Sequence, residues 1–301
     1  MNELIAQFKK NGIDNVIQNE PLKNHTTWKI GGPAKLFFEP SSVKELQEGL
    51  AEIKKRSIPW FALGRGSNVL VADEGLDGVV IKLGDGLAQL DQQDELFTVG
   101  SGYSLIKLAT IVSKKGYSGL EFAGGIPGSV GGAVFMNAGA HNADISTILT
   151  KALILMPDGE LYWINRDDLG FNYRTSNLHQ NGGICIAAQF CLEKGNTVEI
   201  RKRLQKNKAY RKNTQPWNDP CCGSVFRNPL PLYAGEIIEN LGLKGEAVGG
   251  AQVSEKHANF IINAGGATAN DVLTLIKKIQ DLALNRYGVE MKTEVEYVGE
   301  K

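Results

Sequence analysis

Residues 122–140 read FAGGIPGSVGGAVFMNAGA, and this glycine-rich stretch is the most informative part of the sequence. Glycine in a core helix or a central strand costs about 0.5–1 kcal/mol relative to alanine, so the stretch predicts a loop of sharp bends. Such a backbone can bring several N–H groups close to a bulky anion. A shorter loop of the same kind, LGRGSNV at residues 63–69, follows the apolar run 60–63. Together the two loops predict a large phosphate-bearing ligand that is held from two sides.

The composition indicates a globular chain without a strong overall charge. Of the 301 residues, 42% are hydrophobic and 22% are charged, and the 33 Lys and Arg residues equal the 33 Asp and Glu residues in number. No net field therefore attracts nucleic acid or a membrane surface, and an anionic ligand must be bound by local groups. The sequence indicates no obligate protein partner.

The termini, apolar runs and cysteines favour a cytoplasmic location. The N-terminal residues lack the apolar region of a signal peptide, and no stretch approaches the roughly 20 apolar residues that span a bilayer. Cys185 and Cys191 lie in a strand-like run, whereas Cys221 and Cys222 are adjacent, which suits neither a metal knuckle nor an ordinary disulfide. Free thiols in a reducing compartment are the simplest interpretation. The 4 histidines are scattered and predict no metal site.

Hydrophobic periodicity predicts an α+β protein in about three pieces. Helices are expected from 41 or 42 to about 56 and at 104–115, 197–212, 235–241 and 269–287. Strands are expected at 35–39, 60–63, 79–83, 96–100, 149–156, 160–164, 184–192, 259–263 and 294–298. The helix at 197–212 is rich in Lys and Arg, which is typical of a solvated face.

Common nucleotide-binding motifs explain the glycine loops only in part. The first loop partly matches G-x-G-x-x-G but lacks the third glycine, and no clear helix follows it, which argues against a Rossmann site. No P-loop motif occurs. Two tight turns without a ligand remain an alternative. Hydrogen-bonding side chains at the turns favour a ligand site: Arg65, Ser67, Asn68, Ser129 and Asn137.

The combination of motifs resembles the flavin-binding half of the vanillyl-alcohol-oxidase (PCMH-type) FAD proteins. It resembles the UDP-N-acetylenolpyruvoylglucosamine reductase family much more closely, over nearly the whole chain. The matching segments are NHTTWKIGGP at 24–33, GRGSN at 64–68, GLEFAGGIPGSVGG at 119–132, YR at 173–174, GSVFRNP at 223–229 and TEV at 293–295.

This resemblance implies an α+β fold with a two-part FAD-binding module and a smaller α+β substrate-binding domain. Residues 1–83 would form the first FAD-binding subdomain, with the strand at 293–301 returning to it or to the flavin site. Residues 84–200 would form the second subdomain, and 201–292 the substrate-binding domain. The segment between 228 and 269 is short, so the chain resembles the compact form of the family, and we expect an open substrate cleft.

The resemblance also implies bound FAD, with NADPH as the co-substrate. Covalent flavin oxidases often carry a histidine in the first loop, and the absence of His and Cys there implies a non-covalent flavin. The residues expected to hold FAD are Gly64, Arg65, Gly66, Ser67, Asn68, Val69, Gly124, Gly125, Ile126, Pro127, Gly128, Ser129, Gly131, Gly132, Asn137 and Gly139.

The family's reaction reduces UDP-N-acetylglucosamine enolpyruvate to UDP-N-acetylmuramate, in peptidoglycan synthesis and hence cell-wall biogenesis, cell shape, cell cycle and cell division. The resemblance implies that Arg174 faces the substrate carboxylate, that Ser224 donates a proton and that Glu294 stabilises the enol form. A guanidinium can bind a carboxylate through two hydrogen bonds. Glu294 would act best when protonated, which burial favours.

Each of these three residues also has a simpler interpretation when it is taken alone. Arg174 would be a surface ion pair, Ser224 a turn residue and Glu294 an exposed charge beside an edge strand. The sequence also departs from the family near Glu294, because residues 291–295 read MKTEV where LEPEV is common.

Five residues are expected to contact the substrate: Tyr173, Arg211, Lys212, Asn228 and His257. Asn228 matches an asparagine that the family places near the diphosphate. Either Arg211 or Lys212 would pair with the UDP diphosphate, by the ordinary logic of anion pairing. His257 is equally interpreted as a structural histidine.

Three other functions are alternatives to the reductase. The first is a non-covalent FAD oxidase of the same fold, which would use oxygen in place of a second organic substrate. The second is a non-catalytic carrier of a nucleotide or flavin. The absence of a covalent-attachment residue and the matches at Arg174, Ser224 and Glu294 argue against the oxidase, whereas the carrier predicts that Ser224→Ala leaves any activity unchanged. The third uses a thiol nucleophile at Cys221 or Cys222, and it would need a histidine base that the neighbouring sequence does not offer.

Overall fold

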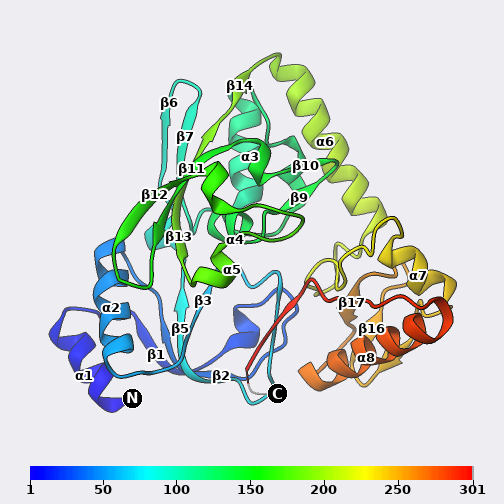
Figure 1. Ribbon diagram of the computed structural model, residues 1–301, viewed down its shortest axis with the longest axis horizontal. Coiled ribbons are helices and arrows are strands. Elements are labelled where there is room, and N and C mark those ends of the chain that lie inside the picture. The colour runs from blue at the N-terminus through cyan, green and yellow to red at the C-terminus, as the bar shows by residue number, and fades with distance from the viewer. Residues whose placement is uncertain (300–301) are drawn as a thin grey trace. The chain divides into compact units, whose positions relative to one another are not determined.

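A five-stranded antiparallel sheet is the largest sheet in the computed structural model, which describes residues 1–299 (Figure 1). Its strand order is β12-β11-β13-β7-β6. Strands β11 (Leu149–Leu155) and β12 (Leu161–Asn165) form the predicted hairpin, and β13 (Ile184–Cys191) pairs with both β11 and β7 (Leu96–Gly100). Strand β6 (Leu90–Gln93) forms the other edge.

The chain divides into two compact units. The first combines Met1–Gln18, Leu36–Arg65 and Gly78–Tyr210, and the second combines Asn19–Lys35, Gly66–Asp77 and the residues from Arg211 onward. The five-stranded sheet lies wholly within the first unit.

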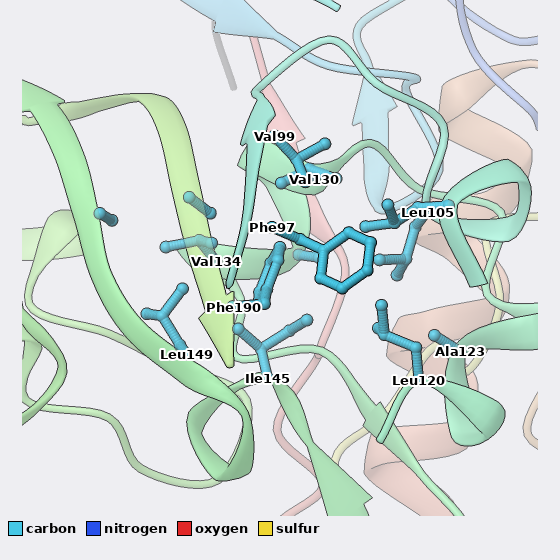
Figure 2. Close-up of a cluster of buried hydrophobic side chains, with 14 of the residues drawn as sticks. Phe97, Val99, Leu105, Leu120, Ala123, Val130, Val134, Ile145, Leu149 and Phe190 are labelled. Atoms are coloured by element: carbon cyan, nitrogen blue, oxygen red, sulfur yellow. The ribbon is translucent and has the colours of Figure 1, made fainter. Parts of the chain in front are cut away.

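Two helices, α3 (Leu105–Lys114) and α4 (Val130–Phe135), contribute to the core on one face of this sheet. Figure 2 shows that core, in which Phe97 and Phe190 of the strands meet Leu105 of α3 and Val134 of α4. All four of these side chains are completely buried. Burial of each large apolar side chain contributes about 1.5–3 kcal/mol to folding, so this core fixes the glycine-rich stretch to the sheet.

The glycine-rich stretch is not the continuous loop that the sequence predicts. It contains the 3-10 turn η3 (Glu121–Gly125) and the short helix α4. Ser129 is the N-cap of α4, and its hydroxyl accepts a hydrogen bond from the amide of Gly132 at 3.3 Å. Because Val130 and Val134 are buried against the sheet, packing and the cap outweigh the low helix propensity of glycine.

A second core in the first unit joins helices α1 (Asn2–Lys10) and α2 (Val43–Lys55) to a four-stranded sheet of order β1-β2-β5-β3. Helix α2 begins after Ser42, whose hydroxyl accepts a hydrogen bond from the amide of Glu45. Strands β3 (Trp60–Leu63) and β5 (Leu76–Lys82) are parallel, with Leu63 opposite Lys82. The first glycine loop therefore leaves the end of β3 beside the end of β5.

Apart from two elements that belong to the second unit, the remaining elements up to α6 are short, except for α6 itself. They are β1 (Val16–Pro21), β2 (Pro33–Phe38), η2 (Asp85–Leu87), β8 (Tyr117–Ser118), β9 (Gly139–Ala140), β10 (Ala143–Asp144), η4 (Ile145–Thr147), η5 (Arg166–Leu169), α5 (Leu178–Asn181), β14 (Glu193–Lys194) and α6 (Thr197–Thr214). Helix α6 is the predicted basic helix, and only Ile200 and Leu204 are buried along it.

The second unit is built around helix α8 (Ala269–Tyr287) and the three-stranded sheet β15-β16-β17. Thr268 and Asp271 form a capping box at the start of α8, and Gly288 ends it with φ 66°. The other elements of this unit are η1 (Leu22–Asn24), β4 (Val69–Val71), α7 (Ala234–Asn240), β15 (Ala247–Val248), β16 (Ala251–Val253), β17 (Ile261–Asn263) and β18 (Glu296–Val298).

The C-terminal strand β18 pairs in parallel with β4, and Tyr297 lies opposite Leu70. The expected strand at 293–301 is thus shorter than predicted, and residues 300–301 lie outside the described residues. The α+β class is confirmed, and the predicted helices and strands recur with shifts of a few residues at their ends. No helix within residues 1–299 is long and apolar enough to cross a membrane.

Candidate active site

Arg174 lies in a tight turn of the first unit. Asn172 and Thr175 exchange backbone hydrogen bonds across it, and Arg174 has φ 56°, a left-handed conformation that is uncommon for arginine. The guanidinium donates a hydrogen bond to the carbonyl of Gly139 at 2.6 Å and lies 5.0 Å from the ring centre of Tyr173. The turn therefore presents a half-buried cation beside the end of the glycine-rich stretch.

Asn137 connects the glycine-rich stretch to this turn. Its amide nitrogen donates to the carbonyl of Asn172 at 3.1 Å and to the carboxylate of Asp144 at 3.3 Å, and its amide oxygen accepts from the Ser146 backbone at 3.0 Å. The side chain is 3% exposed. Asn137, expected to bind FAD, has its amide group engaged within the protein, so it positions the Arg174 turn.

The two glycine loops touch within the first unit. Gly64 follows β3, and a Cβ atom at this position would lie 2.5 Å from the hydroxyl oxygen of Ser129. Such a distance is too short for a real contact, so only glycine allows the loop to pass the N-cap of α4 so closely. Gly131 is similarly confined, because its Cβ would lie 2.7 Å from the Cβ of Ser101.

Several amides of the second loop already have acceptors in the protein. Val130 donates to the carbonyl of Tyr103, Gly131 to that of Ser101 and Gly128 to that of Ile126, each at 2.9 Å. Gly124 and Gly125 are buried, and a Cβ on Gly124 would lie 2.4 Å from a terminal methyl carbon of Leu204 in α6, so the Leu204 side chain would have to move. Arg65, Pro127 and Gly132 are exposed in the loops of this unit, and Gly64, Ile126 and Gly128 are partly exposed.

These residues fit a dinucleotide such as FAD. An exposed guanidinium at Arg65 is suited to a pyrophosphate, and the hydroxyl of Ser129 lies where the two loops meet. Gly132 is exposed, and a Cβ there would have only the Ser129 hydroxyl within 4 Å, at 3.4 Å, so the backbone is open at this point. Residues 66–69, the rest of the first loop, belong to the second unit.

In the second unit, three distant segments are joined beside Ser224. The amide of Glu294 donates to the carbonyl of Val225 at 2.8 Å. The side-chain amide of Asn68 donates to the carbonyl of Glu294 at 3.0 Å, and the Asn68 carbonyl accepts from the amide of Glu296 at 3.0 Å. Two of the three expected catalytic residues, Ser224 and Glu294, are therefore brought onto neighbouring stretches of backbone, with the first glycine loop attached to them.

Asn259 fixes the stretch that follows Ser224, and sequence reasoning missed it. Its side chain accepts from the amide of Phe226 at 3.0 Å and donates to the carbonyl of Phe226 at 2.9 Å. Its own carbonyl accepts from the amide of Val225 at 2.9 Å. Asn259 is 4% exposed, so these bonds are shielded from water. The only signal in the sequence is that Asn259 lies two residues after His257, which is a predicted site residue.

The NHTTWKIGGP motif anchors the same region. Thr27 donates its hydroxyl to the carbonyl of Cys221 at 2.7 Å and is also 3.3 Å from the carbonyl oxygen of Gly66. The indole of Trp28 donates to the carbonyl of Ile261 at 2.8 Å. Gly66 has φ 62°, and a Cβ there would lie 2.2 Å from the carbonyl oxygen of His25, so the first loop is packed directly on this motif.

The predicted substrate contacts are spread over the two units. Tyr173 is 40% exposed in the first unit. In the second unit, the Nε of Arg211 donates to Gln215 at 2.9 Å, Lys212 is exposed, and the side chain of Asn228 accepts from the amide of Ala234 at the start of α7. Arg211 and Asn228 therefore have structural partners as well as their expected roles.

His257 lies beside α7 in the second unit. Its Nδ1 accepts from the amide of Asn259 at 3.3 Å, and its ring lies 4.8 Å from that of Phe260. Burial, and secondly the charge of Lys244, lowers the pKa of His257. A neutral ring gives no cation for a diphosphate, so His257 would contact a substrate as a neutral group.

The cysteines beside Ser224 are not suited to nucleophilic catalysis. All four cysteines are free, and Cys222 is 3% exposed. Burial, with Cys221 and Glu294 as further contributors, raises the pKa of Cys222 well above its ordinary value. Burial also raises the pKa of Cys221. Because the thiolate is the reactive form, both thiols stay unreactive near neutral pH.

Two family descriptions match the chain. Residues 34–165 match the FAD binding domain family, and residues 215–298 match the C-terminal domain of UDP-N-acetylenolpyruvoylglucosamine reductase. The first match includes both Gly64 and the glycine-rich stretch, and the second includes Ser224, Asn259 and Glu294.

Curated relatives match over the full length. The UDP-N-acetylenolpyruvoylglucosamine reductase of Anoxybacillus flavithermus is 56% identical over 302 residues, covering 100% of both chains. The protein of that name from Bacillus subtilis is 53% identical over 300 residues, covering 99% of both chains.

Two solved structures are also similar to this chain. The UDP-N-acetylenolpyruvylglucosamine reductase of Thermus caldophilus is 34% identical, with a TM-score of 0.82, and the match covers 94% of this chain and 98% of that one. An alkyldihydroxyacetonephosphate synthase matches with a TM-score of 0.50 at 16% identity over 64% of this chain, and this likeness extends to the fold alone.

Proposed function

Since the chain belongs to the UDP-N-acetylenolpyruvoylglucosamine reductase family, we propose that it reduces UDP-N-acetylglucosamine enolpyruvate to UDP-N-acetylmuramate with NADPH, in the synthesis of peptidoglycan precursors. The observation that carries this proposal is the joining of the Ser224, Glu294 and Asn68 segments by hydrogen bonds. It sets an alcohol and a carboxyl group on adjacent backbone, as a proton donor and an enol-stabilising acid require.

FAD, when bound, would supply the chemistry of hydride transfer between NADPH and the methylene carbon of the enol ether. The candidate residues to hold it non-covalently are those of the two glycine loops, among which the contact between Gly64 and Ser129 supports a single ligand shared by both loops. The first loop offers no His or Cys for a covalent bond.

The proposed catalytic roles are those that the resemblance to the family implies, and the chemistry of the side chains suits them. Ser224 donates the proton that completes reduction of the carbon–carbon double bond. Glu294 stabilises the enol form of the carboxylate while charge develops on it. Arg174 pairs with the substrate carboxylate, and the left-handed turn and the bond to Gly139 restrict where its guanidinium can point.

For the domain organisation, we propose residues 1–83 and 84–200 as the two FAD-binding subdomains and 201–292 as the substrate-binding domain. The pairing of β18 with β4 supports the return of the C-terminal strand to the first subdomain. We further propose a cytoplasmic protein that needs no nucleic acid, membrane insertion or obligate protein partner, with Tyr173, Arg211, Lys212, Asn228 and His257 as substrate contacts.

The proposal is tested by separating the two half-reactions of the holoenzyme. Ser224→Ala is expected to leave flavin reduction by NADPH unchanged and to slow the step with the enolpyruvyl sugar by about 10²–10⁴-fold, the usual contribution of a general acid. Ser42→Ala, which removes only the cap of α2, is the control and is expected to leave both steps unchanged. Equal rates for the Ser224→Ala and wild-type proteins in the second step would show that Ser224 is not the proton donor.

A further inference from the structure

Lys82 reaches the first glycine loop from the end of β5. Because β3 and β5 are parallel and Leu63 lies opposite Lys82, the side chain of Lys82 starts beside the residue that precedes Gly64. Its Nζ donates a hydrogen bond to the carbonyl oxygen of Gly64 at 2.5 Å. All of these residues belong to the first unit. The lysine thus holds the same glycine whose Cα faces the hydroxyl of Ser129.

The ammonium group lies among other charges in a largely buried place. Burial, opposed by the charge of Glu39, lowers the pKa of Lys82 to about 8; the charge of Arg65 acts with burial, and that of Asp85 acts with Glu39. Glu39 lies close to the end of β5, because its carboxylate oxygen is 1.9 Å from where a Cβ on Gly84 would be. Burying an ammonium group costs free energy unless it has a strong hydrogen-bond acceptor, and the Gly64 carbonyl provides one.

We propose that Lys82 is a positioning residue for the flavin cofactor, because it holds the Gly64 carbonyl and thereby orients the peptide that joins Gly64 to Arg65. In a planar trans peptide, the C=O and the following N–H point in opposite directions. The hydrogen bond from Lys82 to the Gly64 carbonyl therefore turns the amide N–H of Arg65 away from Lys82. It also keeps the Gly64 carbonyl oxygen from facing the pyrophosphate of FAD. This inference rests on the proposed function, since it assigns the loop to FAD.

Lys54, also in the first unit, serves as a matched control for Lys82. Lys54 also donates its ammonium group to a backbone carbonyl, that of Pro157 at 2.9 Å, and burial also lowers its pKa. It lies on α2, and its acceptor lies in the turn of the β11–β12 hairpin. Loss of Lys54 removes the same kind of hydrogen bond without touching a glycine loop.

The test measures the dissociation constant of FAD from apoprotein by quenching of flavin fluorescence, in wild type, Lys82→Met, Lys82→Arg and Lys54→Met. Loss of a charge-assisted hydrogen bond predicts at least about tenfold weaker binding for Lys82→Met. Lys54→Met is expected to bind FAD as wild type does. Lys82→Arg keeps a permanent charge, so it is expected to retain most of the affinity.

The pH profile separates positioning by a charge from a purely structural role. Wild-type affinity is expected to fall as the pH rises through about 8, where Lys82 loses its proton. Lys82→Arg is expected to show no such fall, because arginine stays charged. Equal dissociation constants for Lys82→Met and wild type would overturn the inference. If Lys82→Met does not fold, a flat wild-type profile between about pH 7 and pH 9.5 would overturn it instead. Failure of wild-type apoprotein to bind FAD at all would refute the proposed function rather than the role of Lys82.

Discussion

Replacing Asn259 with alanine tests whether this buried side chain holds the stretch that follows Ser224. The substitution removes two hydrogen bonds, one accepted from the amide of Phe226 at 3.0 Å and one donated to its carbonyl at 2.9 Å. Phe226 is 1% exposed, so water cannot replace the lost partners. Each of the two buried groups left without a partner costs about 1–3 kcal/mol, which gives a loss of about 2–6 kcal/mol in the free energy of unfolding.

The assay is unfolding in urea, followed by single-turnover kinetics of the folded variant. Asn259→Ala is expected to shift the unfolding midpoint to lower urea and to slow the proton-donating step while flavin reduction by NADPH is kept. Asn181→Ala is the matched control, because Asn181 is exposed and its side-chain oxygen accepts a hydrogen bond from the amide of Gly183 at 2.9 Å, the loss of which should cost less than about 0.5 kcal/mol. If Asn259→Ala lowers the free energy of unfolding by less than about 1 kcal/mol, the reasoning is refuted.

Two other substitutions test the glycine loops and a buried carboxylate. Gly64→Ala is expected to weaken FAD binding about fivefold, because the new Cβ would lie 2.5 Å from the Ser129 hydroxyl and displace the α4 cap, which is worth about 1 kcal/mol. Ser129→Ala removes the same cap, so the double variant should bind FAD no more weakly than Ser129→Ala alone, and additive losses would exclude this clash as the cause. Glu121→Gln is expected to lose about 2 kcal/mol in unfolding free energy at pH 7. Burial would raise the pKa of Glu121, but hydrogen bonds from the Gly119 amide and from Arg203 lower it overall. The stability that this carboxylate gives is therefore lost as the pH falls through its lowered folded-state pKa, so urea midpoints of variant and wild type should converge at acid pH, and a constant gap would contradict this assignment.

Local signals in the sequence were sufficient for most helices and strands. Helix α8 was predicted at 269–287 because its apolar stripe is regular, and in the structure Thr268 caps its start and Gly288 its end. Strands β3 and β7 were predicted with their observed bounds, since each is a short apolar run beside glycines or turns. The helix α4 was missed, because its stability comes from burial of Val130 and Val134 rather than from propensity.

The residues that hold the candidate site together could not be predicted in the same way. Thr27 contacts Cys221 across 194 positions of sequence, and Asn259 contacts Phe226 across 33. Such side-chain-to-backbone bonds leave no periodic pattern, so only the folded chain reveals them. The resemblance to a known family identified Arg174 and Ser224 as candidates, but it could not say what positions them.

The central claim is that a bound flavin passes electrons from NADPH to an enolpyruvyl sugar, and anaerobic stopped-flow absorbance of the purified wild-type protein tests it most directly. The account predicts flavin bands that NADPH bleaches and that UDP-N-acetylglucosamine enolpyruvate restores within the turnover time. Bands that return only when air is admitted would identify an oxidase, and protein that carries and binds no flavin would contradict the account altogether.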